Sequence, residues 1–465
     1  MFKETYEPLY NSVDELLNQL DTAVGRKFYE LDINHRLDRN SNKGVLGQIV
    51  EEGVFHYPIN SRPEADFANL GIELKTLGVL RNKRDISAKE RLPLNTFNYD
   101  KVAEQEFEDS DVWHKCEKML LALYEYIEGI PYGDMRLIKG LLHEFEPSDL
   151  AIIQNDYRIL QEKIRNGFAA DISESDTNYL AACTAGGGHG QTTSTIYSNV
   201  PVKPRKFSLK TNYMTTFVRK HLTKVELEHI VAAAELMDHS LEEVIISRLN
   251  RYVGISEYEL TGLMDREFDS KDRFERYVAF MLGAKGKVNN SDEFQKANIT
   301  LKTIRVEEDG SIEQNMSFPA FSFIDIVNEE WEESSFRDMM INQKFLFVIF
   351  RNVGGQYVFD KAKFWSIPEY ILDTEGRAVF EELKDVLISG NIVRGFQTLS
   401  SGKTIRLNNF PKSSTNGYFH IRPHGQDSTD TNPLPVPDRL TGAVEFTKQC
   451  FWLHRDYVLD VINED

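Results

Sequence analysis

The chain has 465 residues, of which 41% are hydrophobic and 11% aromatic, and its formal net charge is −19. This composition excludes a disordered or fibrous chain, and because domains usually contain about 100 to 200 residues, it predicts two folded domains. No segment has the apolar length of a signal peptide or of a membrane span, so we expect a soluble, cytoplasmic protein.

The first third of the chain alternates between predicted helices and strands. Apolar residues at helical spacing predict helices over residues 13–31 and 44–55. Residues 64–79 instead show the alternation of strands, joined by a turn at Leu70-Gly71. The apolar run 119–124 predicts a buried central strand, and residues 150–166 predict a further helix.

The middle of the chain contains a glycine-rich loop between a strand and a helical region. Residues 178–183 are typical of a strand, and 224–252 have helical spacing. The loop at 184–190 (TAGGGHG) lacks the Gly-Lys-Ser/Thr ending of a nucleotide-binding P-loop, so we interpret it as a surface loop. The three cysteines have no paired spacing, which predicts reduced thiols rather than a disulfide framework or a zinc cluster.

Three sequence blocks occur twice in the same order. Residues 66–76 (DFANLGIELKT) recur without a gap at 293–303 (EFQKANITLKT), and 106–110 recur at 330–334, each followed by an apolar strand. A weaker echo relates 207–214 to 446–453. One match could arise by chance, but three in order predict a duplicated domain at 1–222 and 268–465, joined by a helical linker at 223–267.

The first copy of the repeated block carries acidic and basic side chains in a pattern suited to metal-dependent chemistry. On a strand, side chains two apart point to the same face, so Glu73 and Lys75 project together. Asp66 lies across the turn and can return to that face. Two carboxylates supply hard oxygen ligands for Mg²⁺, and a lysine can orient a metal-bound water, which predicts phosphodiester hydrolysis. A structural ion pair is the alternative for these residues.

The spacing of these residues is not specific by itself. Glu375, followed by Glu382 and Lys384, has the same spacing, but the apolar residues around it have helical periodicity. On a helix, Glu382 and Lys384 lie on nearly opposite sides, so we interpret this second occurrence as a solvated helix face.

Basic residues are concentrated in one segment of this acidic chain. Residues 201–224 include seven Lys and Arg residues and no Asp or Glu. A nucleic-acid ligand needs such a positive surface, although a solvated charged loop would have the same composition.

Four blocks of the first domain resemble the MutH family of DNA mismatch-repair endonucleases. They are 43–51 (KGVLGQIVE), 66–76, His114-Lys115 and 204–210 (PRKFSLK). The two-domain arrangement resembles the related GATC-cutting restriction enzymes of the Sau type. Residues 89–92, 178–184 and 420–424 are similar to that branch.

The resemblance implies an α/β restriction-endonuclease-like fold, the PD-(D/E)xK type found in MutH, and Mg²⁺-dependent cutting of double-stranded DNA at GATC. Asp66 and Glu73 would bind the metal, Glu51 would assist, and Lys75 would serve the attacking water. Lys115 would complete the active site. The residues expected to contact DNA are Lys43, Lys203, Arg205, Lys206 and Lys210. For Lys43 and Lys115, a role as surface charges is the alternative.

The second domain departs from this pattern at the positions that matter for catalysis. Glu73 is replaced by Thr300 and Asp66 by Glu293, and Lys115 aligns near Met339, whereas Lys302 is retained. A threonine hydroxyl is not the anionic ligand that Mg²⁺ requires, so we expect this domain to be inactive. It would bind DNA as an allosteric effector, or serve as a structural lid.

Three functions remain open from the sequence alone. The first is a type II restriction endonuclease, which with one active site per chain would pair transiently on DNA to cut both strands. The second is a mismatch-repair nickase that acts with partner proteins. The third is a DNA-binding regulator that does not cut.

Overall fold

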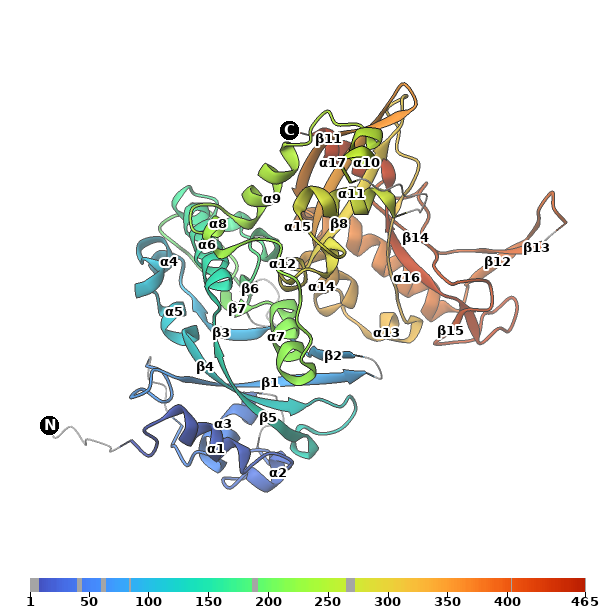
Figure 1. Ribbon diagram of the computed structural model, residues 1–465. Helices are drawn as coiled ribbons and strands as arrows, with labels where there is room; N and C mark the ends of the chain where they lie inside the picture. The colour runs from blue at the N-terminus through green and yellow to red at the C-terminus, as the bar shows by residue number, and fades with distance from the viewer. Residues whose placement is uncertain are drawn as a thin grey trace. The chain divides into compact units, whose positions relative to one another are not determined.

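The computed structural model describes residues 8–39, 44–59, 64–82, 85–185, 191–264, 272–402 and 404–464. The chain folds into two compact units (Figure 1). Unit 1 comprises Met1–Val244 and Asn289–Asn298, and unit 2 comprises Ile245–Val288 and Ile299–Asp465. This division differs from the predicted domains, because residues 289–298 were expected in the second domain but pack as part of unit 1.

Unit 1 is built on a four-stranded sheet with one parallel pair at its centre. In spatial order its strands are β2 (Asp85–Ala88), β1 (Glu73–Asn82), β4 (Lys118–Glu125) and β5 (Arg136–Glu144). β1 and β4 are parallel, and the two outer pairs are antiparallel. The six central residues of β4 are buried, which confirms the predicted central strand.

Three short helices contribute to the core of unit 1 at one side of this sheet (Figure 1). They are α1 (Val13–Asp21), α2 (Phe28–Leu31) and α3 (Gly44–Gly53). The prediction of one helix over residues 13–31 was wrong, because the chain turns after α1 and passes through Gly25 at a φ of +86°. That left-handed conformation ends a helix and costs little at glycine.

A second sheet of unit 1 contains three antiparallel strands. They are, in spatial order, β3 (Leu92–Phe97), β7 (Arg205–Leu209) and β6 (Leu180–Thr184). The helices of this part are α4 (Tyr99–Glu104), α5 (Asp111–Cys116), α6 (Pro147–Arg165) and α7 (Thr211–Thr223). β6 and α6 confirm two predicted elements, whereas residues 186–190 of the glycine-rich loop lie outside the described residues.

The predicted helical linker is only partly helical. Residues 224–232 are not helical, and α8 (Ala233–Leu236) and α9 (Leu241–Asn250) follow. α10 (Glu257–Met264) and α11 (Arg273–Leu282) belong to unit 2, and α12 (Asp292–Ala297) belongs to unit 1.

Unit 2 has the same kinds of sheets as unit 1. One sheet has the order β11 (Gln356–Trp365), β10 (Lys344–Val353) and β8 (Ile299–Val306), and β8 and β10 are parallel. The other has the order β14 (Phe419–Pro423), β17 (Gln449–Leu453) and β9 (Met316–Ala320). Two smaller pairs are β12 (Val393–Thr398) with β13 (Thr404–Asn408), and β15 (Thr431–Pro433) with β16 (Glu445–Thr447). The helices are α13 (Phe323–Asn328), α14 (Ser335–Ile341), α15 (Glu369–Ile371), α16 (Arg377–Ser389) and α17 (Arg455–Asn463).

The pairing of the strands agrees with the first repeated sequence block and with the apolar strand that follows the second. It does not agree with the alignment of the third block. Glu73 lies opposite Met119 in the parallel pair of unit 1, and Thr300 lies opposite Phe345 in that of unit 2. By contrast, β7 and β17 each end one residue before a helix N-cap, at Leu209 and Leu453. The structural counterpart of Leu209 is therefore Leu453, five residues from the register of the predicted echo.

Two expectations from composition can be compared with the structure. All three cysteines are free thiols, as predicted, and the structure shows that they are buried. Among the described residues, no helix combines the length and apolarity needed to cross a membrane.

Candidate active site

Strand β1 presents an acidic and a basic side chain on one face. Glu73, at the start of β1, is 5% exposed. The Nζ atom of Lys75 lies 2.9 Å from Oε1 of Glu73, as expected for side chains two apart on a strand. Leu74, between them, is buried in the core of unit 1. Core packing of Leu74 therefore fixes the face on which Glu73 and Lys75 lie.

A tight turn returns Asp66 to the start of this strand. Phe67 and Ile72 form an isolated antiparallel bridge, and Gly71 in the turn has a φ of +66°. The Oδ2 atom of Asp66 accepts a hydrogen bond of 2.9 Å from the backbone amide of Leu74. The structure thus places Asp66 beside β1, as the turn in the sequence predicts.

Lys115 reaches the same carboxylate from helix α5. Its Nζ atom donates to Oε2 of Glu73 at 3.0 Å and to the carbonyl oxygen of Glu64 at 2.8 Å. The side chain is 17% exposed. Lys115 is therefore not a solvated surface charge, and Glu73 is held between two lysines.

Helix α3 adds a third carboxylate, that of Glu51. Burial raises the pKa of Glu51 to about 7, and the nearby charges of Asp66 and Glu73 add to this shift. Burial, followed by the charge of Glu73, also raises the pKa of Asp66. The guanidinium of Arg36 holds α3 through two hydrogen bonds to Glu52, at 2.5 and 2.7 Å. The ion pair between Arg36 and Glu52 was not predicted, because nothing in the local sequence relates Arg36 to a residue 16 positions later.

The donor set at this site fits a divalent cation that keeps part of its water shell. Burial, and then repulsion between neighbouring carboxylates, raises the pKa of Glu51 and of Asp66, so a bound cation would favour their charged forms. Among the described residues, no group of three or more His, Cys, Asp and Glu side chains forms a ready-made metal site. Mg²⁺ commonly binds through one or two carboxylates and several waters, so Asp66 and Glu73 are sufficient donors for it.

The predicted DNA-contacting residues divide into buried and exposed groups. Arg205 is 3% exposed and donates to the carbonyl oxygens of Ala182 and Ile172. Lys210 is also buried, and its Nζ atom donates to the carbonyl oxygen of Thr177 at 2.5 Å. The predicted DNA contacts of Arg205 and Lys210 are therefore corrected, because these side chains join β6 and β7 to the preceding turns.

The remaining predicted DNA-contacting residues are Lys43, Lys203 and Lys206. Lys203 and Lys206 are exposed on the same basic segment. Lys43 lies outside the described residues. DNA contacts by Lys203 and Lys206 therefore stay a prediction.

The counterparts of the site residues in the second repeat have structural contacts. Glu293, in unit 1, accepts hydrogen bonds from the backbone amides of Ile230 and Val231 and lies 3.4 Å from His229. Burial opposes ionisation of Glu293, but the hydrogen bonds from His229 and the backbone outweigh it and lower the pKa of this carboxyl. In unit 2, the hydroxyl of Thr300 accepts a hydrogen bond of 3.0 Å from Gln343, and burial lowers the pKa of Lys302.

The segment from Glu375 to Lys384, which has the same spacing of charged residues as Asp66 to Lys75, is helical, as predicted. Glu375 lies in a π-helical turn that continues into α16, which contains Glu382 and Lys384. Lys384 donates to the carbonyl oxygen of Glu329 at 2.6 Å, so its ammonium group points away from Glu382 towards a neighbouring turn.

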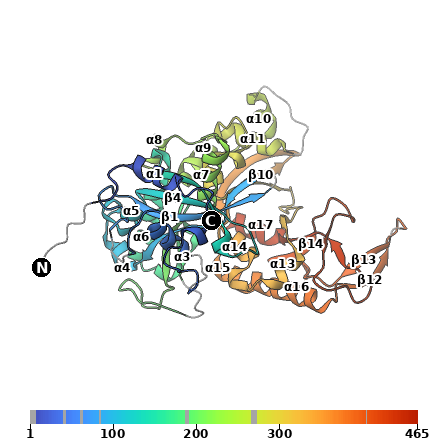
Figure 2. The ribbon, with the colours of Figure 1, turned by 90° about the horizontal axis from the view of Figure 1, so that it is seen from below.

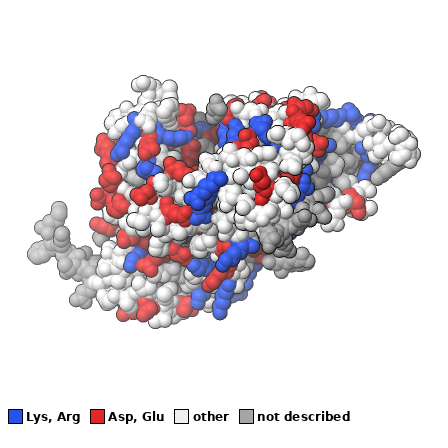
Figure 3. Space-filling model, turned by 45° about the horizontal axis from the view of Figure 1, so that its top comes forward, with Lys and Arg blue, Asp and Glu red and all other residues white. Residues whose placement is uncertain are grey.

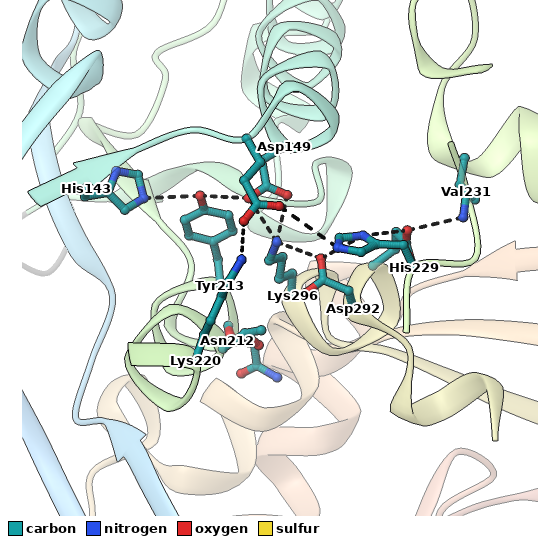
Figure 4. A network of polar contacts seen from close by, with 12 residues as sticks. His143, Asp149, Asn212, Tyr213, Lys220, His229, Val231, Asp292 and Lys296 are labelled. Carbon is teal, nitrogen blue, oxygen red and sulfur yellow. Dashed lines mark hydrogen bonds and ion pairs between the residues drawn. The ribbon is translucent and has the colours of Figure 1, made fainter. Parts of the chain in front are cut away.

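A second charged cluster lies in unit 1 and holds α12 in place (Figure 4). The Nζ atom of Lys296 lies 2.8 Å from Asp149 and 2.6 Å from Asp292. The hydroxyl of Tyr213 donates to Asp149 at 3.2 Å and also contacts His143. A cavity of about 450 Å³ adjoins the cluster. Sequence analysis missed it, because its residues come from segments far apart in the chain.

Comparisons with known proteins show similarity to DNA mismatch-repair and restriction enzymes. The family described as DNA mismatch repair enzyme MutH matches residues 55–156, which include Asp66, Glu73, Lys75 and Lys115. The DNA mismatch repair protein MutH of Shewanella baltica (strain OS195) is 26% identical over 216 residues, covering 45% of this chain and 95% of the relative. The corresponding protein of Shewanella sp. (strain MR-7) is 24% identical with the same coverage.

One relative extends over both units. The type II restriction enzyme Sau3AI of Staphylococcus aureus is 31% identical over 473 residues, which cover 95% of this chain and 96% of the relative. The similarity to the MutH proteins, by contrast, accounts for less than half of the chain.

Proposed function

The chain belongs to the family of the type II restriction enzyme Sau3AI, and on that premise we propose that it is a Mg²⁺-dependent endonuclease that cuts double-stranded DNA at GATC sites. The observation that carries this proposal is the cluster of Glu51, Asp66 and Glu73 with Lys75 and Lys115. Its carboxylates are suited to binding a metal ion. Its lysines are suited to orienting water and contacting the phosphate during hydrolysis of a phosphodiester.

Each side chain of the cluster has a distinct task in this proposal. Asp66 and Glu73 bind Mg²⁺, which when bound stabilises negative charge that develops on the scissile phosphate. Lys75 orients the attacking water, and Lys115 holds Glu73 while offering its ammonium group to the phosphate. Glu51, with its pKa of about 7, can accept a proton near neutral pH.

The second unit would have arisen by duplication of the first and lost catalysis. Support comes from the common order of their strands and from the matching register of Glu73 and Thr300 in their parallel pairs. Thr300 provides no anionic ligand and Glu293 is committed to backbone amides. We assign to unit 2 a DNA-binding, allosteric role.

One active centre cuts one strand, so a double-strand break requires two chains that pair transiently on DNA or two successive nicks. We prefer transient pairing. A nickase of the mismatch-repair type is the second candidate, favoured by the similarity of the Shewanella proteins, but such relatives cover only 45% of this chain.

Cleavage of plasmid DNA tests this function. Purified chain with Mg²⁺ should convert a supercoiled, unmethylated plasmid containing GATC into linear fragments, and should leave a matched plasmid without GATC intact. Open-circular product alone would favour the nickase. A GATC plasmid that stays supercoiled would refute the proposed activity.

A further inference from the structure

Acidic residues are absent from two segments of this otherwise acidic chain. The sequence contains 73 Asp and Glu residues in 465, yet none lies between Asp176 and Glu226 or between Asp385 and Asp427. The first segment includes β6, β7 and the exposed Lys203 and Lys206 of unit 1. The second includes β12, β13 and β14 of unit 2. A surface without carboxylates avoids repulsion of phosphate, so both segments are suited to nucleic acid.

The second acid-free segment contains a hairpin for which unit 1 has no equivalent. β12 and β13 pair between helix α16 and strand β14. In unit 1, the interval between α6 and β6 contains only two 3-10 turns. The hairpin projects from the rest of unit 2 in both ribbon views (Figures 1 and 2). In Figure 3, red carboxylates are scattered over the molecule, whereas its outermost part at the right shows white atoms and no red ones.

One face of the hairpin combines an aromatic ring with a guanidinium group. Phe396 pairs with Arg406 across the two strands, so their side chains share a face, and Phe396 is 57% exposed. Thr398 and Thr404 extend that face towards the tip with hydroxyl groups 3.2 Å apart. The guanidinium of Arg406 lies 4.9 Å from the ring of Phe446, which orients it.

Three arginines of this segment have no carboxylate partner among the described residues. Within the part of the chain that the structure describes, no ion pair joins Arg394, Arg406 or Arg422 to a carboxylate. By comparison, Arg377 on the neighbouring helix α16 lies 3.5 Å from Glu332 and 3.9 Å from Glu381. The hairpin and the adjacent strand β14 therefore carry net positive charge.

The base of the hairpin is fixed to the loop between β15 and β16. The buried carboxylate of Asp438 accepts hydrogen bonds from the amides of Ile392 and Val393, at 3.1 and 2.8 Å. The segment from β14 to β17 contains four acidic residues, including Asp438, whereas the segment from β6 to β7 contains none. In unit 2, the connection between the last two strands thus contains acidic residues that the corresponding connection of unit 1 lacks, and the acid-free stretch contains the hairpin instead.

We propose that the β12–β13 hairpin is the DNA-contacting element of unit 2 and inserts into a groove of duplex DNA. The major groove admits a two-stranded ribbon, and arginine, threonine and phenylalanine are side chains that contact base edges and thymine methyl groups there. Arg394 and Arg422 contact the flanking phosphates. This inference rests on the proposed function, since it specifies how the second unit binds the DNA that regulates the first.

The test uses the full-length chain with Glu73→Ala, which prevents cleavage, and a fluorescent duplex containing GATC. Sedimentation with fluorescence detection counts the duplexes bound per chain. The chain with the intact hairpin should bind two duplexes. The double variant Arg394→Ala with Arg406→Ala should bind one duplex per chain at the same DNA concentration. In the chain with the intact hairpin, the salt dependence of binding the second duplex should correspond to about two phosphate contacts. Arg377→Ala is the matched control and should still give two.

Conservative variants separate charge from folding. Arg394→Lys with Arg406→Lys keeps the charge and should retain the second duplex with reduced affinity, and circular dichroism should be unchanged in all variants. If two duplexes still bind with unchanged affinity after the alanine substitutions, the hairpin inference is wrong. If the chain with an intact hairpin binds only one duplex per chain at every DNA concentration, the DNA-binding role proposed for the second unit fails.

Discussion

Strands β1 and β8 have the same register in equivalent parallel pairs but differ in the chemistry that they present. On β1, Glu73 lies between Lys75 and Lys115, whereas on β8 the equivalent residue is Thr300, which accepts a hydrogen bond from Gln343. Lys302 is retained, but burial lowers its pKa. Under the proposed function, the two units share a backbone scaffold, and the replacement of one carboxylate removes the metal site from the second.

The segments that lead into these strands differ in the same way. Asp66 precedes β1 in a tight turn and keeps a carboxylate of raised pKa beside Glu73. Glu293 precedes β8 in helix α12 and uses its carboxylate to bind backbone amides. Under the proposed function, Asp66 serves catalysis, whereas Glu293 stabilises the fold.

The largest expected effect is on the cleavage rate, when the carboxylates of Asp66 and of Glu293 are each replaced by an amide. Asp66→Asn preserves the acceptor for the Leu74 amide but removes the anionic metal ligand, so the cleavage rate should fall on the order of 1,000-fold. Glu293→Gln should leave the rate within about twofold, because this residue binds no metal in our account. Single-turnover cleavage of a GATC duplex measures both. Equal losses in the two variants would mean that the segments do not differ in function.

Removing the buried ammonium group of α12 should cost stability rather than catalysis. Lys296→Met leaves Asp149 and Asp292 without their cation, and breaking such a buried pair should lower the free energy of unfolding by about 3 kcal/mol. Lys101→Met, which breaks an exposed pair with Asp111, should cost less than about 1 kcal/mol. Urea denaturation provides the comparison. A similar small cost for both variants would contradict the structural role assigned to α12.

Lys115 and Lys118 are neighbouring lysines that should differ in importance. Lys115→Met removes a cation from Glu73, and we expect cleavage to slow about 10- to 100-fold. Lys118 pairs with the exposed Glu144, so Lys118→Met should have little effect on rate or stability. Steady-state cleavage by the two variants would separate these roles, and an unchanged rate for Lys115→Met would remove Lys115 from the active site.

The smallest expected effect is a pH-dependent change in stability at Glu51. Its pKa of about 7 exceeds the ordinary 4.5, so the folded chain retains a proton that the unfolded chain releases. Folding therefore loses stability as the pH rises from 4.5 to 7, by about 1 to 2 kcal/mol after allowance for partial exposure. Glu51→Gln should remove this loss and stabilise the metal-free chain at pH 8 but not at pH 4. A difference that is independent of pH would contradict the burial of this carboxyl group.

Local periodicity allowed the catalytic strand to be predicted. Alternation around Leu74 fixed the common face of Glu73 and Lys75, and the turn at Gly71 accounted for the return of Asp66. Glu51 and Lys115 come from other elements, so only the resemblance to the MutH family indicated their place beside Glu73.

Long-range packing explains where the predictions failed. The composition of residues 201–224 showed positive charge but not its direction, and Arg205 and Lys210 proved to be buried against backbone carbonyls. The weak echo at 446–453 matched residue types without strand pairing, so its register was wrong by five residues. The placement of α12 depends on Asp149, which is 147 residues away from Lys296 and invisible to any local pattern.

The central claim is that β1 carries the nuclease centre and β8 carries none. The most direct measurement is prolonged incubation of a supercoiled GATC plasmid with Mg²⁺ and either Glu73→Ala or Thr300→Ala. The account predicts no open-circular or linear product above the enzyme-free control for Glu73→Ala, and wild-type cleavage for Thr300→Ala. Continued nicking by Glu73→Ala that disappears in the double variant would show a working centre on β8 and would contradict the account.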